Sequence, residues 1–187
     1  KDLTTNLYQG YISGTKIVKG TALYTTTFTP PTTPLTAISG TSLLTSMTNA
    51  AIYDNAEVAD YETVGNAQIS TSVKKYGTGS IAFDGSGDYL TTPSNTAFNL
   101  GSGDFTIELW WYPLEFTADG ELFTCRTGST RCFAMYTYNN DGTLYAYAGT
   151  GGGGGWDIIN QQAMGGARRN AWNHMAFTRS GNTFRTY

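Results

Sequence analysis

Alternation of apolar and polar residues is the clearest pattern along this chain, and it predicts β-strands. It is strongest in residues 103–114, where every second position is large and apolar: Phe105, Ile107, Leu109 and Trp111. Successive side chains of a strand point to opposite faces, so this segment is expected to bury one face. The intervening positions, which include Glu108, are then expected on the solvent side.

Shorter segments of the same kind recur along the chain, with turn residues between them. Asn-Asp-Gly at 140–142 is a strong hairpin signal, because these residues tolerate positive φ. We expect about ten strands after residue 40, spaced by about 8–12 residues, as in antiparallel sandwiches and barrels. The pattern lacks alternating strands and helices, which excludes a nucleotide-binding α/β fold. The expected segments are 41–46, 62–69, 79–85, 88–92, 103–114, 120–127, 131–138, 143–149, 156–160, 171–181 and 182–187.

A proline-rich segment follows the first predicted strand. Residues 10–28 alternate, and parity places Ile12, Lys16 and Val18 on one face. The prolines at 30, 31 and 34 cannot donate hydrogen bonds to a sheet, so the strand is expected to stop before them. The sequence predicts an extended, partly polyproline stretch here, which is the strongest linker signal in the chain.

Composition narrows the range of partners. The chain has 187 residues, a net charge of −3 and 13% charged residues, and its basic residues are scattered. Binding to nucleic acid requires clustered Lys and Arg, so nucleic acid is excluded as a partner. No apolar run approaches the roughly 20 residues of a membrane-spanning helix, so membrane insertion is not expected. A surface rich in Thr, Asn and Tyr suits an extracellular or virion-surface protein.

Two aspartates and two glycines lie close together in residues 83–93, FDGSGDYLTTP. Asp84 and Asp88 offer oxygen ligands for calcium, but their spacing does not match the EF-hand loop. A phosphate-binding loop would lead into a helix, whereas a strand follows here. We therefore favour a tight turn in which Gly85 and Gly87 adopt positive φ and the aspartates cap backbone N–H groups.

Residues suited to catalysis are sparse. His174 is the single histidine and no nucleophile motif is found, so a Ser-His-Asp triad lacks support and His174 is expected to pack at a strand edge. Glycoside hydrolases use two carboxylates that flank one bond. Glu108 and Glu115 are seven residues apart and point to opposite faces by parity, so they do not predict a glycosidase.

Two cysteines, Cys125 and Cys132, flank a short predicted turn. If the turn centres on residues 128–129, they lie directly opposite each other on a hairpin. A non-hydrogen-bonded pair then brings their Cα atoms to about 4.5 Å, within reach of a disulfide. A cross-strand disulfide and two free thiols both remain open, and free thiols are favoured for a protein assembled in a reducing cytoplasm.

Aromatic residues gather around the predicted hairpins and the glycine-rich stretch at 149–156. Sugar recognition combines aromatic stacking with hydrogen bonds from polar side chains. Some of the tyrosines must also build the core, so only part of the set is free to bind. The candidate glycan-binding residues are Tyr136, Tyr138, Asn139, Asn140, Tyr145 and Trp156.

Two blocks of the sequence resemble one known family. They are GSIAFDGSGDYLTTPSNTAFNLGSGDFTIELWWYP at 79–113 and AWNHMAFTRSGNTFRTY at 171–187. In order and content they are similar to the laminin-G-like, concanavalin A-like lectin/glucanase family, and especially to tandem repeats in bacteriophage tail and virion-surface proteins. The resemblance implies an all-β, antiparallel jelly-roll β-sandwich, here expected to lack its closing strands.

The resemblance also implies a division of the chain. Residues 8–35 resemble the closing strand of such a repeat, so residues 1–35 are expected to end a preceding repeat. Residues 36–62 would then be a linker, and 63–187 a sandwich that is incomplete at its C-terminal end. In the alternative, residues 8–20 fold back and supply the closing strand. We prefer the first arrangement, because the prolines indicate separation.

Function follows from the same resemblance. It implies a non-enzymatic module at the virion surface, on a tail fibre or the capsid, that is assembled in the host cytoplasm and adheres to host glycans. Other virion proteins and copies of itself are the expected partners. The alternatives are a structural spacer without ligand and, less favoured, a glycan hydrolase. Calcium is the one cofactor that the family suggests, with candidate ligands Asn140, Asp141, Asp119 and Glu121.

Overall fold

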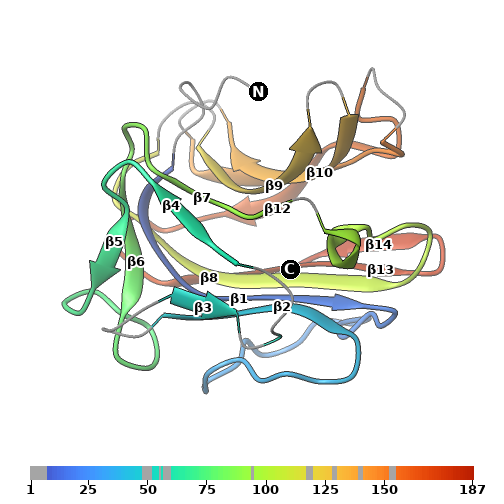
Figure 1. Ribbon diagram of the computed structural model, residues 1–187. Coiled ribbons are helices and arrows are strands. Elements are labelled where there is room, and N and C mark those ends of the chain that lie inside the picture. Colours follow the sequence, from blue (N-terminus) through green and yellow to red (C-terminus); the bar gives the residue numbers. More distant parts are fainter. Residues whose placement is uncertain are drawn as a thin grey trace.

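The chain folds into two β-sheets stacked face to face, with a short two-stranded ribbon at one side (Figure 1). The computed structural model describes residues 8–47, 52–54, 56, 60–93, 95–116, 120–127, 130–138, 141–151 and 155–187. All strand pairs in this part of the chain are antiparallel. The predicted all-β sandwich is therefore confirmed.

The larger sheet has eight strands. Its main path runs through β14 (Thr183–Thr186), β13 (Asn173–Ser180), β8 (Phe105–Pro113), β1 (Gln9–Lys19), β2 (Thr41–Met47) and β3 (Ile52–Asp54). Two strands pair with the side of β1 that faces away from β8. The last residues of β1 pair with β2, and its first residues pair with β6 (Ser80–Asp84). The short strand β5 (Gln68–Ser70) pairs with β6 and completes the sheet.

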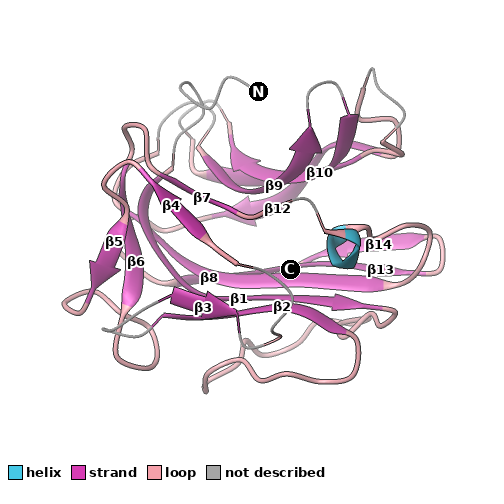
Figure 2. Ribbon diagram, in the orientation of Figure 1, coloured by secondary structure: helices cyan, strands magenta, loops and turns pink. Residues whose placement is uncertain are grey.

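The smaller sheet has four strands in the order β12 (Ile159–Gly166), β11 (Thr143–Ala148), β10 (Thr130–Thr137) and β9 (Glu121–Thr127). The ribbon consists of β4 (Glu62–Val64) and β7 (Tyr89–Thr91). In the described residues, the only helical element is a single 3-10 turn, η1 (Thr96–Phe98), which Figure 2 shows beside the larger sheet. In that part of the chain, no helix is long and apolar enough to span a membrane.

The core fills the space between the sheets. It is built from alternate residues of each strand, as the periodicity predicts. The four apolar residues of the strongest predicted strand are all buried in it, together with facing residues of the smaller sheet. These residues are Phe105, Ile107, Leu109, Trp111, Phe133, Met135, Leu144 and Ala146.

The N-terminal strand lies inside this sandwich. β1 pairs with β8 from Gly10↔Pro113 to Lys19↔Phe105, so it occupies the middle of the larger sheet. This is the alternative arrangement, in which the N-terminal strand folds back. Residues 36–62, expected to be a linker, contribute β2 and β3 to the same sheet. Whether β1 originates in a preceding repeat of a longer protein stays a prediction.

A bulge in β1 changes which of its residues face the core. Parity grouped Ile12 with Lys16, but the pairing of β1 with β8 shifts register between Ser13 and Thr15. Gly14 sits in this bulge at φ 67°, a conformation that favours glycine. The shift places Ile12 and Ile17 in the core and Lys16 on the outer face, which corrects the prediction from parity.

The proline-rich segment does not separate two modules. Residues 20–40, which we call the strap, pack on the outer face of the larger sheet, and Figure 1 shows them as blue loops beneath β1 and β2. Leu23 N–H donates to Oγ1 of Thr106 at 2.9 Å, and Oγ1 of Thr178 donates to the carbonyl of Tyr24 at 2.9 Å. Both faces of this sheet are therefore covered.

Most of the other predicted strands are confirmed, with two differences. The segment expected at 62–69 is split by a turn into β4 and β5. The strand expected at 156–160 begins at Ile159 and continues to Gly166, through polar and small residues that carry no alternating signal. It is an edge strand and mostly exposed, so its pairing with β11, rather than burial, defines it.

The turn at residues 84–88 has the predicted structure. Gly85 and Gly87 adopt φ of 84° and 80°. Oδ1 of Asp84 accepts the N–H of Ser86 at 2.7 Å. Asp88 is buried and accepts the N–H groups of Asp84 at 3.0 Å and Asn66 at 2.8 Å. Because both carboxylates are occupied by N–H donors, this motif is a turn and not a metal loop.

The cysteine pair departs from the predicted register. The Cα partner of Cys125 is Phe133, not Cys132, because the pairing of β9 with β10 shifts between Arg131 and Phe133. Cys132 is the extra residue of this bulge. Both cysteines are free thiols in this structure.

Candidate functional site

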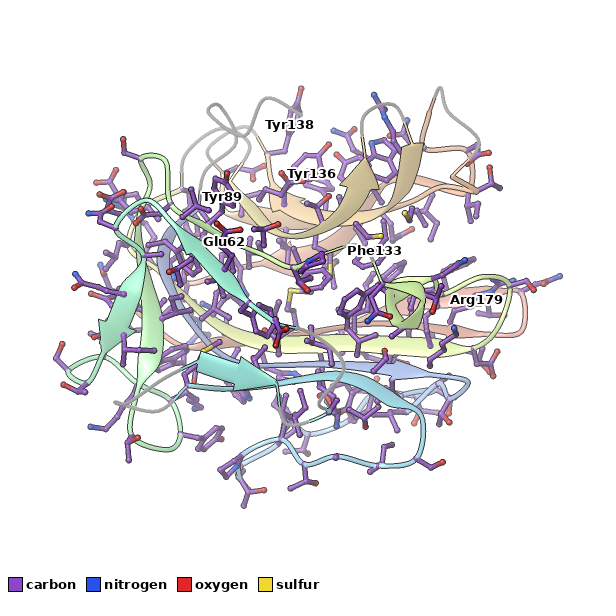
Figure 3. The ribbon with its side chains drawn as sticks, in the orientation of Figure 1. Glu62, Tyr89, Phe133, Tyr136, Tyr138 and Arg179 are labelled. Carbon is purple, nitrogen blue, oxygen red and sulfur yellow. The ribbon has the colours of Figure 1, made fainter. Side chains whose placement is uncertain are left out.

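The outer face of the four-stranded sheet carries a cluster of aromatic side chains. Phe133 and Met135 of β10 are buried in the core, so the next position, Tyr136, points away from it. Figure 3 shows Phe133 directed toward the larger sheet, and Tyr136 and Tyr138 on the other side. Tyr145 of β11 is the cross-strand partner of Tyr136 and shares its face.

Three rings of this cluster, those of Tyr136, Tyr147 and Trp156, lie in contact. The rings of Tyr136 and Tyr147 are nearly parallel, at 7°, with centroids 4.4 Å apart. The indole centroid of Trp156 lies 5.4 Å from the Tyr147 ring and is tilted by 49° to it. Tyr147 is only 2% exposed, whereas Tyr136 and Trp156 are half-buried. The middle ring therefore supports two outer rings that can still be reached from solvent.

A second aromatic pair extends the cluster along the same strands. Tyr138 and Tyr145 meet edge to face, with ring centroids 6.5 Å apart, and both are half-buried. Offset and edge-to-face pairs are each worth about 0.5–1.5 kcal/mol beyond area burial, so these rings hold one another in place. We define the aromatic face as Tyr136, Tyr138, Tyr145, Tyr147 and Trp156.

The loop that carries Trp156 is tied to the backbone of β10. Gly149 N–H donates to the carbonyl of Cys132 at 2.8 Å, and Gly151 N–H donates to that of Arg131 at 3.1 Å. The guanidinium of Arg131 then lies 5.5 Å from the centroid of the Trp156 ring, which is within cation–π range. A cationic donor thus stands at one end of the aromatic face.

The far end of the loop is closed by one carboxylate. Asp157 accepts two hydrogen bonds from Thr150, from its N–H at 2.8 Å and from its hydroxyl at 2.6 Å. These hydrogen bonds lower the pKa of Asp157 below its ordinary value. They bring the two ends of the glycine-rich stretch together, so the position of Trp156 is set by the loop ends.

The predicted glycan-binding set is partly assembled by this geometry. Four members, Tyr136, Tyr138, Tyr145 and Trp156, lie on the aromatic face. Asn139 and Asn140 lie outside the described residues. Sequence reasoning missed Arg131, and it counted Tyr147 among the aromatic residues of these hairpins without naming it as a binding residue. A role for these residues in binding stays a prediction.

The predicted calcium ligands are not brought together in the described part of the chain. Asn140 and Asp119 lie outside it. Asp141 is exposed, and its Oδ1 accepts the N–H of Thr143 at 2.7 Å, as in a turn. Glu121 begins β9 as the Cα partner of Tyr136. Among the described residues, no group of three or more His, Cys, Asp and Glu side chains could hold a metal ion.

A cluster of polar side chains around Glu108 lies on the opposite side of the molecule from the aromatic face. Sequence reasoning missed this cluster. Glu108 was expected to face solvent, but it is 0% exposed beneath the strap. Lys16 Nζ lies 2.6 Å from its Oε1, and the Tyr24 hydroxyl donates to its Oε2 at 2.6 Å. His174 Nε2 lies 3.3 Å from the same Oε2. A buried charge requires such partners.

Burial and hydrogen bonding act on Glu108 in opposite directions. Burial raises the pKa of its carboxyl, but the hydrogen bonds from His174, Lys16 and Tyr24 outweigh burial and leave the pKa below its ordinary value. Burial raises the pKa of the Tyr24 hydroxyl, and the hydrogen bond to the Glu108 carboxylate raises it further. The group is therefore an ionised carboxylate whose Oε1 forms an ion pair with Lys16 and whose Oε2 contacts Tyr24 of the strap and His174.

His174 also differs from its expected position. It lies on β13, an inner strand between β14 and β8, and not at a strand edge. Its ring packs against Trp110 at 4.9 Å and against Phe28 of the strap at 5.6 Å. Its side chain is only 3% exposed, so the strap buries it together with Glu108.

Comparison with known proteins identifies the family. Residues 84–187 match the family model described as the concanavalin A-like lectin/glucanases superfamily, and this match covers more than half of the chain. No curated protein and no solved structure matches the chain significantly. Domains of this type bind carbohydrates or other ligands and are typically non-catalytic. The chain therefore belongs to the concanavalin A-like lectin/glucanase superfamily, as its sequence resemblance predicted.

Proposed function

We propose that this protein is a non-enzymatic carbohydrate-binding module and that its aromatic face binds the sugar. The observation that carries the proposal is the ring cluster of Tyr136, Tyr147 and Trp156, in which the buried Tyr147 ring stacks on one half-exposed ring and contacts the other at a tilt. The C–H groups on one side of a pyranose ring pack well against such aromatic surfaces. Family membership supports ligand binding in general.

A polar side chain beside the rings supplies hydrogen bonds that a sugar needs. Arg131 offers guanidinium N–H donors next to Trp156, and these can bind the hydroxyl groups of a saccharide. The proposal therefore assigns ring contact with the sugar to Tyr136 and Trp156, and hydrogen bonding to Arg131.

Binding without turnover is supported by the position of Glu108. This carboxylate was weighed as half of a glycosidase pair, but it lies on the outer face of the larger sheet, beneath the strap. Glu115, the other carboxylate considered for that pair, is exposed, and its Oε1 lies 3.9 Å from the guanidinium of Arg169. A glycosidase requires two carboxylates that flank one bond of the substrate, and Glu108 is buried, so these two do not support hydrolysis.

We extend the proposal to the setting that the sequence resemblance implies. The module would act at a virion surface, beside other virion proteins and copies of itself, and would adhere to host glycans. Weak sites repeated along a fibre gain affinity through effective concentration, so a shallow aromatic face would suffice. The extension rests on the similarity of residues 79–113 and 171–187 to repeats of virion-surface proteins.

A glycan array probed with an oligomeric form of the whole chain tests the proposal. Trp156→Ala and Tyr136→Ala should each abolish most of the signal. Trp172→Ala is the matched control, because it removes an indole that packs against Tyr112, away from the aromatic face. Circular dichroism checks that each variant folds. Adding EDTA shows whether calcium, through residues such as Asp141, takes part.

Three outcomes contradict the proposal. If no glycan binds the oligomer, a spacer without ligand is the better interpretation. If Trp172→Ala loses as much binding as Trp156→Ala, the site lies elsewhere. If the wild-type protein cleaves the bound polysaccharide and the Glu121→Gln variant does not, the module is an enzyme.

A further inference from the structure

The two cysteines of the β9–β10 hairpin are close enough to react with each other. Cys125 Sγ donates a hydrogen bond to Cys132 Sγ across 3.0 Å, and both thiols are half-buried and reduced. A disulfide bond measures about 2.05 Å, so a movement of roughly 1 Å would close it. Cys132 is the extra residue of the β-bulge and comes directly before Phe133, the Cα partner of Cys125.

We propose that Cys125 and Cys132 form a reversible dithiol–disulfide pair whose oxidation cross-links the β9–β10 hairpin at the base of the loop that carries Trp156. This site is independent of the proposed carbohydrate binding, since it stands on the geometry of the two thiols alone.

The two thiols differ in reactivity. The hydrogen bond from Cys125 lowers the pKa of Cys132 to about 7, against the opposing effect of burial. The same hydrogen bond, together with burial, raises the pKa of Cys125. The thiolate is the nucleophile in disulfide exchange, so Cys132 attacks first and Cys125 resolves the intermediate.

The reaction needs an oxidant, and a small-molecule disulfide such as oxidised glutathione supplies it. The Cys132 thiolate attacks one sulfur of the oxidant, whose S–S bond breaks, and one glutathione leaves as a thiolate that takes up the proton lost by Cys132. Cys125 then loses its proton and attacks Cys132 in the mixed disulfide. The second glutathione leaves and takes up that proton, so two protein thiols and one disulfide yield one protein disulfide and two thiols.

The cross-link would act on the loop through the backbone. The carbonyls of Cys132 and Arg131 accept hydrogen bonds from the N–H groups of Gly149 and Gly151, so the start of the loop is hydrogen-bonded to the bulge. Fixing Cys132 to Cys125 restrains this bulge. The exchange of the Gly149 and Gly151 amides should therefore slow when the pair is oxidised.

The first experiment treats the full chain with oxidised glutathione under native conditions. Peptide mass spectrometry should show an intramolecular Cys125–Cys132 link that has lost two hydrogen atoms, and dithiothreitol should reverse it. The melting temperature should rise by about 5 °C, as expected for a short closed loop. Cys125→Ser should stop at a mixed disulfide on Cys132, and Cys132→Ser should react more slowly.

Specific results overturn the proposal. Stable glutathione adducts on both cysteines of the wild-type chain, or disulfide-linked dimers, would show that the thiols do not pair. An oxidised chain with an unchanged melting temperature would show that the bond does not restrain the hairpin. Hydrogen exchange tests the second part: equal exchange at Gly149 and Gly151 in both redox states would remove the link to the loop. The Cys→Ser changes are small, and the wild-type measurement stands without them.

Discussion

The ammonium group of Lys16 lies 2.6 Å from Oε1 of Glu108, and the two side chains are 9% and 0% exposed. They come from adjacent strands, β1 and β8, and are direct cross-strand partners on the outer face of the larger sheet. Ion pairs at a sheet surface contribute little because water screens them. This pair is sealed beneath the strap, so each charge depends on the other.

Removing one charge of this pair should destabilise the protein strongly. Lys16→Met leaves the Glu108 carboxylate buried without its cation, and we expect a loss of about 3–5 kcal/mol in the free energy of unfolding. Lys16→Met combined with Glu108→Leu should recover most of this loss. Urea denaturation measures both. Lys19→Met, on the same strand but exposed, is the control and should change stability by less than about 0.5 kcal/mol.

The same carboxylate should make stability depend on pH. The folded-state pKa of Glu108 lies below its ordinary value of 4.5, so the folded state binds this proton less readily than the unfolded state. Its contribution is therefore present above pH 4.5 and is lost as pH falls through the folded pKa. The groups that face it are Lys16, Tyr24 and His174.

The difference in unfolding free energy between wild type and Glu108→Gln isolates this contribution. The difference should shrink as the pH falls below 4.5. Other carboxylates titrate in both proteins, so their effects cancel. A difference that does not change between pH 5 and pH 3 would show that Glu108 is not held as a buried anion.

The contact between the β4–β5 turn, which contains Gly65, and the β6–β7 turn, which contains Gly87, offers a test of backbone geometry. Gly65 adopts φ 77°, and a Cβ there would collide with the Asp88 carboxylate and with the carbonyl of Gly87. Gly87 adopts nearly the same φ, 80°, but a Cβ there meets nothing. Gly87→Ala should cost about 1–2 kcal/mol for the left-handed conformation, and Gly65→Ala should cost about 1–3 kcal/mol more for the collision. Equal losses in thermal unfolding would contradict the packing described here.

The sequence predicted the sandwich because its core strands carry a local signal. Phe105, Ile107, Leu109 and Trp111 alternate, and each is buried as expected. The turn at residues 84–88 was also predictable, since glycine and aspartate act there through their own backbone. The family resemblance relied on the same local blocks, and the comparison confirmed it.

The sequence could not predict the outer face of the larger sheet. Glu108 occupies the polar position of an alternating strand, and only a segment 84 residues away, which carries Tyr24, decides that it is buried. The prolines of the strap say where a strand cannot run but not what the segment packs against. The bulge at Gly14 moved Lys16 to that face, and a bulge cannot be read from parity. The aromatic face depended likewise on cross-strand register, which placed Tyr145 beside Tyr136.

The strap should loosen when its single contact with the buried carboxylate is removed. Tyr24→Phe deletes the hydroxyl that donates to Glu108 at 2.6 Å, and hydrogen bonds to charged groups are worth about 1.5–3 kcal/mol. Hydrogen exchange over residues 20–40 should accelerate, including at the Leu23 amide, while the core strands stay protected. Tyr112→Phe is the control, because no described hydrogen bond involves its hydroxyl. If Tyr24→Phe leaves exchange of residues 20–40 as slow as in wild type, the ring stacking of the strap, and not the carboxylate, holds it to the sheet.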